Sequence, residues 1–582
     1  LLHLTGYEDM TLDELKNFRQ LGAKTAGHPE YGHAKGIEIT TGPLGQGITS
    51  AVGMALAERH LNARFGDDLV DHWTYVIAGD GCLMEGISQE GISLAGSLNL
   101  NKLIVLWDDN DICIDGPVSM TTADDQGARF KAAGWNVDAV DGHDPDAVAK
   151  AIEAAKTSDK PTLIACKTTI GRGAPNKEGT SATHGAPLGD DEIALAREAM
   201  DWPHAPFEIP ENVVAAWRDA GGRGAAERKD WEGRLSGNGA KDDFQRAING
   251  DLPDGWDNAV IAHKKAVSEE APGWATRVAS GKALEVLTEA IPEMIGGSAD
   301  LTGSVNTKTP STEVLSSEDY TGRYVHYGVR EHGMAAVMNG MALHGGVIPY
   351  SGTFLVFADY MRGAMRLSAL MEQRVVYVLT HDSIGLGEDG PTHQAVETVA
   401  SLRAMPNFHV FRPCDGVETA ECWALALARG DGPSGMVLTR QGLPTLRTEH
   451  TDENLSARGA YVLAEADGDR EATILATGSE VSVAMEARDL LQADGIPTAV
   501  VSMPCWELFD QQDKAYRKEV LGTGTKRVAV EAAIRQGWDR YIEWHDKFVG
   551  MTGFGASAPA ADLFEHFGIT AQKVADAVKS RV

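Results

Sequence analysis

Short apolar runs alternate with longer amphipathic stretches along most of the chain. The runs at residues 75–78, 103–107 and 375–380 are rich in aliphatic residues and are bounded by glycine or polar residues, as expected for strands buried on both faces. Stretches with helical periodicity lie between such runs. Because alternating strands and helices favour parallel sheets, the pattern predicts an α/β protein with mostly parallel sheets. Further strands are predicted at residues 161–166, 408–411, 436–439, 472–477, 498–502 and 527–531.

Residues 1–25 predict a pair of helices. Thr11 can cap the second helix, with Glu14 three residues further on, and apolar residues then recur at helical spacing: Leu12, Leu15, Phe18 and Leu21. The chain lacks an initial Met and opens within an apolar run, which indicates that the given sequence begins inside a domain.

The chain divides into three α/β blocks. Its 582 residues predict about three or four domains by length. Residues from about 221 to 273 change to Gly, Ala, Lys and Asp with scattered tryptophans, which favours an interdomain connection with helical pieces. The predicted domains are residues 1–250 with a connection to about 273, residues 274–448, and residues 449–582.

Polar residues follow two of the predicted strands. Asp80 lies in a Gly-Asp-Gly turn directly after one run, and Asn110 follows the next run along the chain. Adjacent parallel strands would place both side chains at the edge where open α/β sheets bind ligands. The Asp80 carboxylate, the Asn110 amide oxygen and the Ile112 carbonyl are hard oxygen ligands that suit Mg²⁺ or Ca²⁺ together with phosphate oxygens. A Gly-Asp-Gly turn alone is more often a plain turn, and the second strand end is what favours a ligand site.

A glycine-rich stretch, residues 42–47, precedes a predicted helix with many small residues. Two interpretations are equally supported. Backbone amides at the helix start can face an anion, or the small side chains allow close packing of a buried helix.

The overall charge limits the partners. The chain carries 84 acidic against 52 basic residues, a net charge of −32, which argues against nucleic acid or an anionic membrane as the main partner. An anionic substrate would need a local basic pocket. The six cysteines show no metal-ligand spacing, which favours reduced thiols in a cytoplasmic protein. No apolar run approaches the roughly 18 to 20 residues that a membrane helix needs.

Six motifs occur in the order found in transketolases, and the chain resembles that family over essentially its whole length. The motifs are residues 28–30, 42–47, 79–86, 184–189, 326–331 and 381–394. The family's second diphosphate-anchoring motif is commonly Asn-Asn, whereas this chain has Asp109-Asn110. The resemblance implies a diphosphate-binding domain, a pyrimidine-binding domain and a C-terminal domain in an intertwined homodimer, with active sites at the interface.

The implied activity is the reversible transfer of a two-carbon ketol unit in the pentose phosphate pathway. The donor would be a ketose phosphate such as xylulose 5-phosphate, and the acceptor an aldose phosphate such as ribose 5-phosphate. Thiamine diphosphate would supply the carbanion that side chains cannot. Its Mg²⁺ (or Ca²⁺) would be held by Asp80, Asn110 and the Ile112 carbonyl.

The resemblance also assigns the coenzyme contacts. Glu331 matches the glutamate that hydrogen-bonds the aminopyrimidine ring, although a carboxylate at a helix start is the ordinary alternative. Phe354, Phe357 and Tyr360 recur every third residue, which predicts one side of a helix. Alone they would more often be core, and the resemblance makes them the pyrimidine pocket. The full implied coenzyme set is Asp80, Gly81, Asn110, His184, Glu331, Phe354, Phe357 and Tyr360.

The implied substrate contacts lie in both of the first two domains. A terminal phosphate site would comprise Arg277, Ser304, His381 and Arg440, since arginine binds phosphate bidentately and keeps its charge. His28 and His393 would contact the donor's C1 and C2 oxygens, Asp389 its C2 hydroxyl, and His184 would shuttle a proton. The implied catalytic residues are therefore Glu331, His393, His184 and His28.

Two alternatives to a transketolase remain. One is a different thiamine-diphosphate enzyme, either dihydroxyacetone synthase or a 2-oxo acid dehydrogenase component. The other is a silent homologue that acts as a binding protein. The family carries two further active-site histidines in a segment that would precede Leu1, and the given sequence does not include them.

Overall fold

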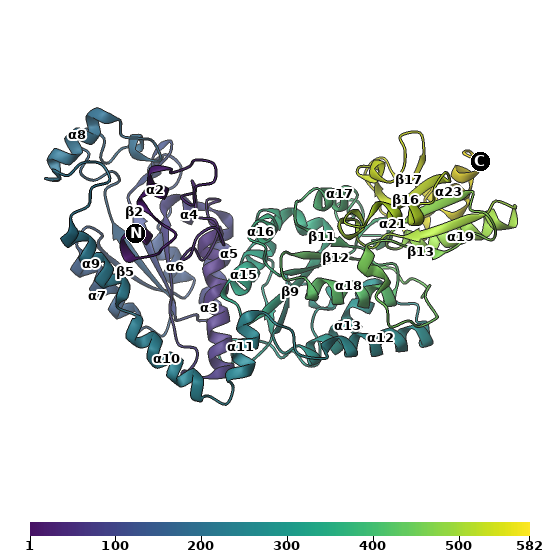
Figure 1. Cartoon of the computed structure of the whole chain (residues 1–582), viewed down its shortest axis with the longest axis horizontal. Coiled ribbons are helices and arrows are strands. Elements are labelled where there is room, and N and C mark those ends of the chain that lie inside the picture. Colours follow the sequence, from purple (N-terminus) through teal and green to yellow (C-terminus); the bar gives the residue numbers. More distant parts are fainter. The chain divides into compact units, whose positions relative to one another are not determined.

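The structure, a computed structural model, describes all 582 residues and contains two compact units (Figure 1). Unit 1 comprises Leu1–Gln245, Ser316–Thr321 and Ala336–Gly346. Unit 2 comprises Arg246–Leu315, Gly322–Ala335 and Val347–Val582. The sheets of both units are almost entirely parallel, so the predicted α/β class with mostly parallel sheets is confirmed.

Unit 1 is built on a four-stranded parallel sheet with the order β1-β2-β6-β5. The strands are β1 (Thr74–Gly79), β2 (Leu103–Asp109), β5 (Asn136–Asp141) and β6 (Thr162–Lys167). β1 and β2 pair so that Gly79 lies opposite Asp108. Both strands therefore end at the same edge of the sheet, as predicted. The residues that follow β1 and those that follow β2 lie together at this edge. A small antiparallel hairpin follows, made of β3 (Ile112–Cys113) and β4 (Gly116–Pro117).

A long, mostly buried helix, α3 (Gln46–Phe65), follows the glycine-rich stretch as predicted. It packs against the later segment Ala336–Gly346 through glycines. A Cβ atom on Gly53 would lie 2.0 Å from the Val337 carbonyl oxygen, and one on Gly340 would lie 1.8 Å from the Ser50 carbonyl oxygen. The small residues thus permit backbone contact between two helices, which supports the packing interpretation of this stretch.

Unit 1 has further helices around its sheet. They are α1 (Leu2–Thr5), α2 (Leu12–Lys16), α4 (Asp80–Met84), α5 (Gly86–Ser97), α6 (Gln126–Ala132), α7 (Pro145–Ala155), α8 (Asp190–Ala199), α9 (Glu211–Gly222) and α10 (Ala225–Gly237). Two helices have residues in both units, namely α11 (Lys241–Asn249) and α15 (Glu331–His344).

Unit 2 contains a six-stranded parallel sheet with the order β11-β12-β10-β9-β7-β8. The strands are β7 (Met294–Ser298), β8 (Tyr324–His326), β9 (Ile348–Phe354), β10 (Val376–Thr380), β11 (His409–Phe411) and β12 (Ser434–Leu438). Three helices pack together along this sheet (Figure 1): α12 (Trp256–Glu270), α13 (Thr276–Ala290) and α18 (Gly416–Ala428). Val376, Val378 and Trp423 belong to the core between them. The remaining helices here are α14 (Thr302–Val305), α16 (Ala358–Leu370) and α17 (Thr398–Arg403).

The C-terminal part of unit 2 carries a five-stranded sheet with the order β13-β15-β14-β16-β17. Only β13 runs antiparallel to its neighbour. Adjacent residues of β14 face opposite cores, since Ile474 packs in one cluster and Leu475 in another. The strands are β13 (Tyr461–Ala464), β14 (Ala472–Ala476), β15 (Thr498–Ser502), β16 (Lys526–Ile534) and β17 (Lys547–Met551). The helices are α19 (Glu480–Ala493), α20 (Trp506–Asp510), α21 (Lys514–Leu521), α22 (Ala560–His566) and α23 (Ala571–Lys579).

Two local predictions were wrong in part. Thr11 does accept a hydrogen bond from the Glu14 amide, but α2 ends at Lys16, so Phe18 and Leu21 lie beyond it. The three aromatic residues from 354 to 360 do not share a helix either, because β9 ends at Phe354 and α16 begins only at Ala358. No helix of the structure has both the length and the apolar character needed to cross a membrane.

The glycine contact in unit 1 gives a stability prediction. Gly53→Ala should lower the free energy of unfolding by about 1–3 kcal/mol, because the new methyl group must push the Val337 backbone away. Gly233→Ala is the matched control, since Gly233 is an exposed position of α10 where a Cβ meets nothing within 4 Å. This change should be neutral or stabilising by about 0.5–1 kcal/mol. Equal unfolding midpoints for the two variants would contradict the packing argument.

Candidate active site

One group of predicted site residues lies in unit 1 and begins with Asp80. This residue starts α4 directly after β1 and is 7% exposed. The indole Nε1 of Trp107 donates a hydrogen bond to Asp80 Oδ1 at 3.0 Å, whereas Oδ2 is buried and has no hydrogen-bond partner. Burial raises the pKa of the Asp80 carboxyl, and the neighbouring Asp109 and Asp111 carboxylates add to that rise. A buried carboxylate with a free oxygen is costly, and a cation would remove this cost.

Asn110 is held in a tight turn after β2. Its Nδ2 donates to Asp108 Oδ2 at 3.1 Å, and the Ile112 amide donates to Asn110 Oδ1 at 3.0 Å. The intervening Asp111 has a left-handed backbone with φ of 61°. These contacts fix the Asn110 amide oxygen and the Ile112 carbonyl beside the end of β1.

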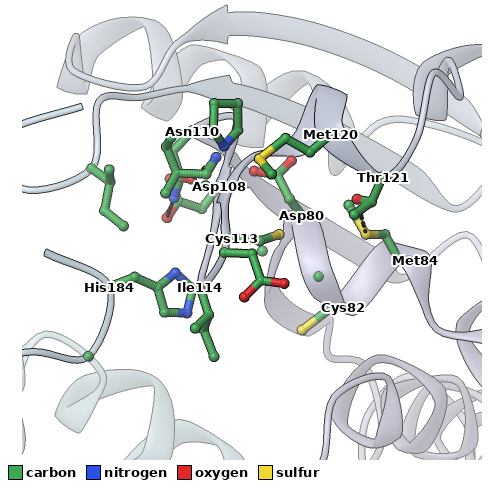
Figure 2. Close-up of a pocket in the computed structure, with 18 of the residues that line it drawn as sticks. Asp80, Cys82, Met84, Asp108, Asn110, Cys113, Ile114, Met120, Thr121 and His184 are labelled. Carbon is green, nitrogen blue, oxygen red and sulfur yellow. Dashed lines mark hydrogen bonds between the residues drawn. The ribbon is translucent and has the colours of Figure 1, made fainter. Parts of the chain in front are cut away.

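Asp80, Gly81, Asn110 and Ile112 line one cavity of about 770 Å³. Figure 2 shows Asp80 and Asn110 around this cavity, with His184 entering from a separate loop. The donor set of one carboxylate, one amide oxygen and backbone oxygen fits a divalent ion that also binds phosphate. His28 is exposed and packs beside Gly42, outside the lining of this cavity.

A separate group of predicted site residues lies in unit 2 and includes an aromatic cluster. Phe354, Phe357 and Tyr360 come from a strand end, a 3₁₀ turn and a helix, yet their rings stack in sequence at 5.8 and 5.7 Å between centroids. His381 stacks on Phe354 at 3.7 Å, and His393 meets Phe357 edge-on at 5.4 Å. Tyr360 is 66% exposed. The cluster thus offers an apolar, flat surface for an aromatic ring.

Glu331 is the first residue of α15 and is buried, with 8% of its surface exposed. The Thr353 hydroxyl donates a hydrogen bond to Glu331 Oε1 at 3.2 Å. Thr353 immediately precedes Phe354 at the end of β9. This contact therefore connects the buried carboxyl group to the strand that carries the first ring of the aromatic cluster.

Three of the four predicted phosphate ligands form a basic cluster. Arg277 donates to the Ser304 carbonyl oxygen at 2.7 Å, and Arg440 donates to the Leu386 carbonyl oxygen at 3.0 Å. Neither guanidinium has a carboxylate partner, and Arg277 Nε is buried without an acceptor. Burial and the Arg440 charge lower the pKa of Arg277. Burial and both arginines lower the pKa of His381 to about 3.

His381, Asp389 and His393 lie in one loop after β10. His381 is buried and has a left-handed backbone with φ of 61°, and its Nδ1 lies 2.8 Å from the Thr380 hydroxyl. Thr392 engages Nδ1 of His393 at 2.9 Å, which leaves Nε2 for a ligand. Asp389 is exposed.

Several positioning residues were missed by the sequence analysis. Trp107 forms a hydrogen bond with Asp80, Thr353 forms one with Glu331, and Asp108 forms one with Asn110. Trp107 and Asp108 were visible only as the end of an apolar run. Thr353 had no signal, since its strand contains glycine, proline and serine.

These features define a class of protein. In unit 1, adjacent parallel strands end in oxygen ligands over a large cavity. In unit 2, an aromatic surface lies near a buried glutamate. The motif resemblance implies this combination for an α/β enzyme that uses thiamine diphosphate.

Comparisons with known proteins identify the family within that class. Residues 1–253 match the model "Transketolase, thiamine diphosphate binding domain". Residues 273–445 match "Transketolase, pyrimidine binding domain", and residues 459–570 match "Transketolase-like TK C-terminal domain". The chain is 58% identical over 583 residues to a transketolase of Cereibacter sphaeroides, covering 100% of this chain and 88% of that protein.

Solved structures agree with this result. A transketolase from Leishmania mexicana matches with a TM-score of 0.94 and 44% identity, covering 100% of this chain and 86% of that one. A transketolase from Pichia stipitis, described as a complex with sedoheptulose 7-phosphate, matches with a TM-score of 0.92 and 41% identity over the same shares. The chain belongs to the transketolase family. It is a thiamine-diphosphate-dependent transferase, as the motif resemblance implied.

The Trp107 contact gives a binding prediction. Trp107→Phe should weaken Mg²⁺-dependent binding of thiamine diphosphate roughly 10-fold or more, because a hydrogen bond to a charged group orients Asp80. Calorimetric titration of the metal-free protein measures this change. Trp73→Phe is the matched control, because Trp73 contacts Lys102 and Lys156 instead of Asp80. Unchanged affinity in Trp107→Phe would show that the indole does not orient the carboxylate.

The basic cluster gives a pH prediction. A lowered pKa keeps His381 neutral above about pH 3, so its imidazole should show no titration between pH 5 and 8 in NMR spectra of the ligand-free protein. The pH dependence of kcat/KM for a sugar phosphate over that range should therefore come from groups other than His381. His381→Asn should keep the shape of that profile. A His381 titration near its ordinary 6.5 would contradict the argument.

Proposed function

We propose that this chain transfers a two-carbon ketol unit reversibly from a ketose phosphate such as xylulose 5-phosphate to an aldose phosphate such as ribose 5-phosphate, as in the pentose phosphate pathway. The main support is the basic cluster of unit 2. Arg277 and Arg440 lie close enough to lower the pKa of His381, and no carboxylate compensates them. In a chain of net charge −32, such a cluster needs an anion.

The phosphate group of the sugar is the anion we assign to this cluster. Arg277 and Arg440 would bind its oxygens, and Ser304 and neutral His381 would complete the contacts with hydrogen bonds. The Pichia stipitis neighbour is described as a sugar phosphate complex, which supports the same substrate class here. A decarboxylase of small 2-oxo acids would not need these residues.

The residues of unit 1 would hold the metal and diphosphate end of the coenzyme. Asp80 and Asn110 would bind Mg²⁺ or Ca²⁺ with the Ile112 carbonyl, and the free Asp80 oxygen supports this role. Gly81 would let the diphosphate approach the backbone. His184 lines the same cavity, where it would move a proton at the reacting oxygen.

The residues of unit 2 would hold the other end of the coenzyme. Phe354, Phe357 and Tyr360 would form the pyrimidine pocket, and Glu331 would hydrogen-bond the ring. Bound thiamine diphosphate would supply the carbanion chemistry that breaks and forms the carbon–carbon bond. Glu331 is buried, and its hydrogen bond from Thr353 would hold the carboxyl group in place for this contact.

The remaining assigned residues would orient the sugar. His393 would donate or accept at the donor's oxygens through Nε2, since Nδ1 is engaged by Thr392. His28 would contact the C1 and C2 oxygens together with His393, and Asp389 would bind the C2 hydroxyl. The domain assignment follows these roles, with diphosphate binding in residues 1–250, pyrimidine binding in 274–448 and a C-terminal domain in 449–582.

We further propose a homodimer with active sites at its interface, because unit 1 carries the metal ligands and unit 2 carries the ring and phosphate contacts. A cytoplasmic location is supported by the six free cysteines, none of which forms a disulfide.

A direct assay tests the proposed function. Xylulose 5-phosphate and ribose 5-phosphate are mixed with the protein, thiamine diphosphate and Mg²⁺, and sedoheptulose 7-phosphate is measured. We expect the product only when both coenzyme and metal are present. Absence of the product under all conditions would overturn the proposal.

Glu331 gives a more specific prediction. Glu331→Gln should keep the fold, bind thiamine diphosphate more weakly and lose turnover by roughly 10²-fold or more, because a neutral amide cannot share a proton with the coenzyme ring. Glu289→Gln, at an exposed position of α13, is the control and should behave as the unmodified chain. Near-normal turnover in Glu331→Gln would remove this residue from the mechanism.

A further inference from the structure

The loop at residues 381–394 is covered by the C-terminal part of the chain. We call this loop the substrate loop, because it carries His381, Asp389 and His393. Residues 381–387 are all buried. The 3₁₀ turn within them, η4 (Ile384–Leu386), packs on α22. The loop that carries the proposed substrate contacts is therefore held by residues of the C-terminal part, to which no contact with substrate or coenzyme is assigned.

The first attachment is a buried arginine, Arg412. Its Nε and Nη2 lie 3.0 and 2.8 Å from Asp382 Oδ2, in the substrate loop. Its Nη1 donates to Glu480 Oε2 at 2.6 Å and to the Thr477 carbonyl oxygen at 2.8 Å, both in the C-terminal part. Arg412, Asp382 and Glu480 are each 1% exposed or less. One guanidinium thus connects the loop to the start of α19.

A second ion pair supports the first. Arg403 donates to both oxygens of Glu531 at 3.0 Å, and its guanidinium stacks on Trp506 at 3.5 Å from the ring centroid. Glu531 also lies 3.6 Å from Arg412 Nη1. A buried network of this kind is weak evidence for stability, because desolvation offsets the attraction, but it holds its members in one arrangement.

The second attachment is Gln394, at the other end of the substrate loop. Its Nε2 donates to the Gly387 carbonyl oxygen at 3.0 Å and to the Ala556 carbonyl oxygen at 2.8 Å. The contact is close, since a Cβ on Gly555 would lie 1.7 Å from Gln394 Oε1. The loop is therefore attached to the C-terminal part at both ends.

The backbone conformation of His381 explains why the substrate loop must be fixed at both ends. Its left-handed backbone is unfavourable for a residue with a side chain and persists only when the surroundings over-determine it. Asp382 is the next residue in the chain, so its bond to Arg412 fixes the backbone that positions the His381 ring. Loss of that bond should let the loop relax toward an ordinary conformation.

We propose that Arg412, Asp382 and Gln394 are positioning residues, through which the C-terminal part of the chain holds the substrate loop in its sugar-phosphate-binding conformation. This inference rests on the proposed function, because it assumes that His381, Asp389 and His393 bind substrate. The bond network itself can be tested without that assumption.

Two conservative variants test the proposal in the full-length protein. Asp382→Asn removes the charge that pairs with Arg412, and Gln394→Met removes the amide at similar size. We expect each to raise KM for xylulose 5-phosphate about 10-fold, with less than a 3-fold change in kcat and unchanged calorimetric binding of thiamine diphosphate. For Asp382→Asn, KM for unphosphorylated xylulose should rise less, because Asp382 fixes the backbone of His381, which we assign to the phosphate.

Matched controls separate positioning from simple destabilisation. Asp415→Asn changes an equally buried carboxylate that caps α18, and Gln492→Met changes a glutamine of α19. Neither should change KM for xylulose 5-phosphate. If Asp382→Asn and Gln394→Met lower the unfolding midpoint as the controls do and leave KM unchanged, the two residues are structural only and the proposal is wrong.

Hydrogen exchange supplies a readout that does not depend on the reaction. Amides of residues 381–394 should exchange at least 10-fold faster in Asp382→Asn and Gln394→Met than in the unmodified protein, and at the same rate in the two controls. Unchanged exchange would overturn the proposal. If the unmodified protein fails to convert sugar phosphates but the exchange pattern is as expected, the proposed function fails while the attachment of the loop stands.

Discussion

The parallel pairing of β1 and β2 is the constraint on which the proposed metal site of unit 1 depends. Gly79 lies opposite Asp108, so the residues that follow each strand emerge at one edge. A shift of the pairing by even one residue would turn the side chains at the strand ends away from each other. With this register, Trp107 satisfies one oxygen of Asp80 and leaves the second buried and unpaired. The energetic cost of that unpaired oxygen is what would favour a cation at the proposed site.

The proposed phosphate site of unit 2 follows the same reasoning with the opposite sign of charge. The Arg440 charge lowers the pKa of Arg277, and both arginine charges lower the pKa of His381. Neither arginine has a carboxylate partner. The pKa of His381 falls so far that it contributes hydrogen bonds and no charge. Two uncompensated cations then favour an anion strongly enough to act against the net charge of −32. Both proposed sites are thus incomplete charge arrangements that a bound ligand would complete.

Much of this could be predicted from the sequence where the signal is local. Apolar runs with clear boundaries gave β1, β2, β10 and β15, and the strand ends gave Asp80 and Asn110. Strands β7 and β9 were missed, because Met294–Ser298 and Ile348–Phe354 contain glycine, serine or proline and do not form apolar runs. The three-residue spacing of the aromatic residues favoured a helix. Tertiary packing instead stacks the rings across a strand end, a turn and a helix, which spacing alone cannot distinguish.

The contacts that could not be predicted join residues far apart in the sequence. Trp107 and Asp80 are separated by 27 positions, and Arg412 and Glu480 by 68. No local sequence pattern marks such pairs. They also share a function: Trp107 holds the half-satisfied carboxylate of Asp80, and Arg412 holds Asp382, which directly follows left-handed His381. Since a left-handed backbone persists only in rigid surroundings, the C-terminal part of the chain would influence the proposed substrate contacts without contributing a residue that touches the substrate.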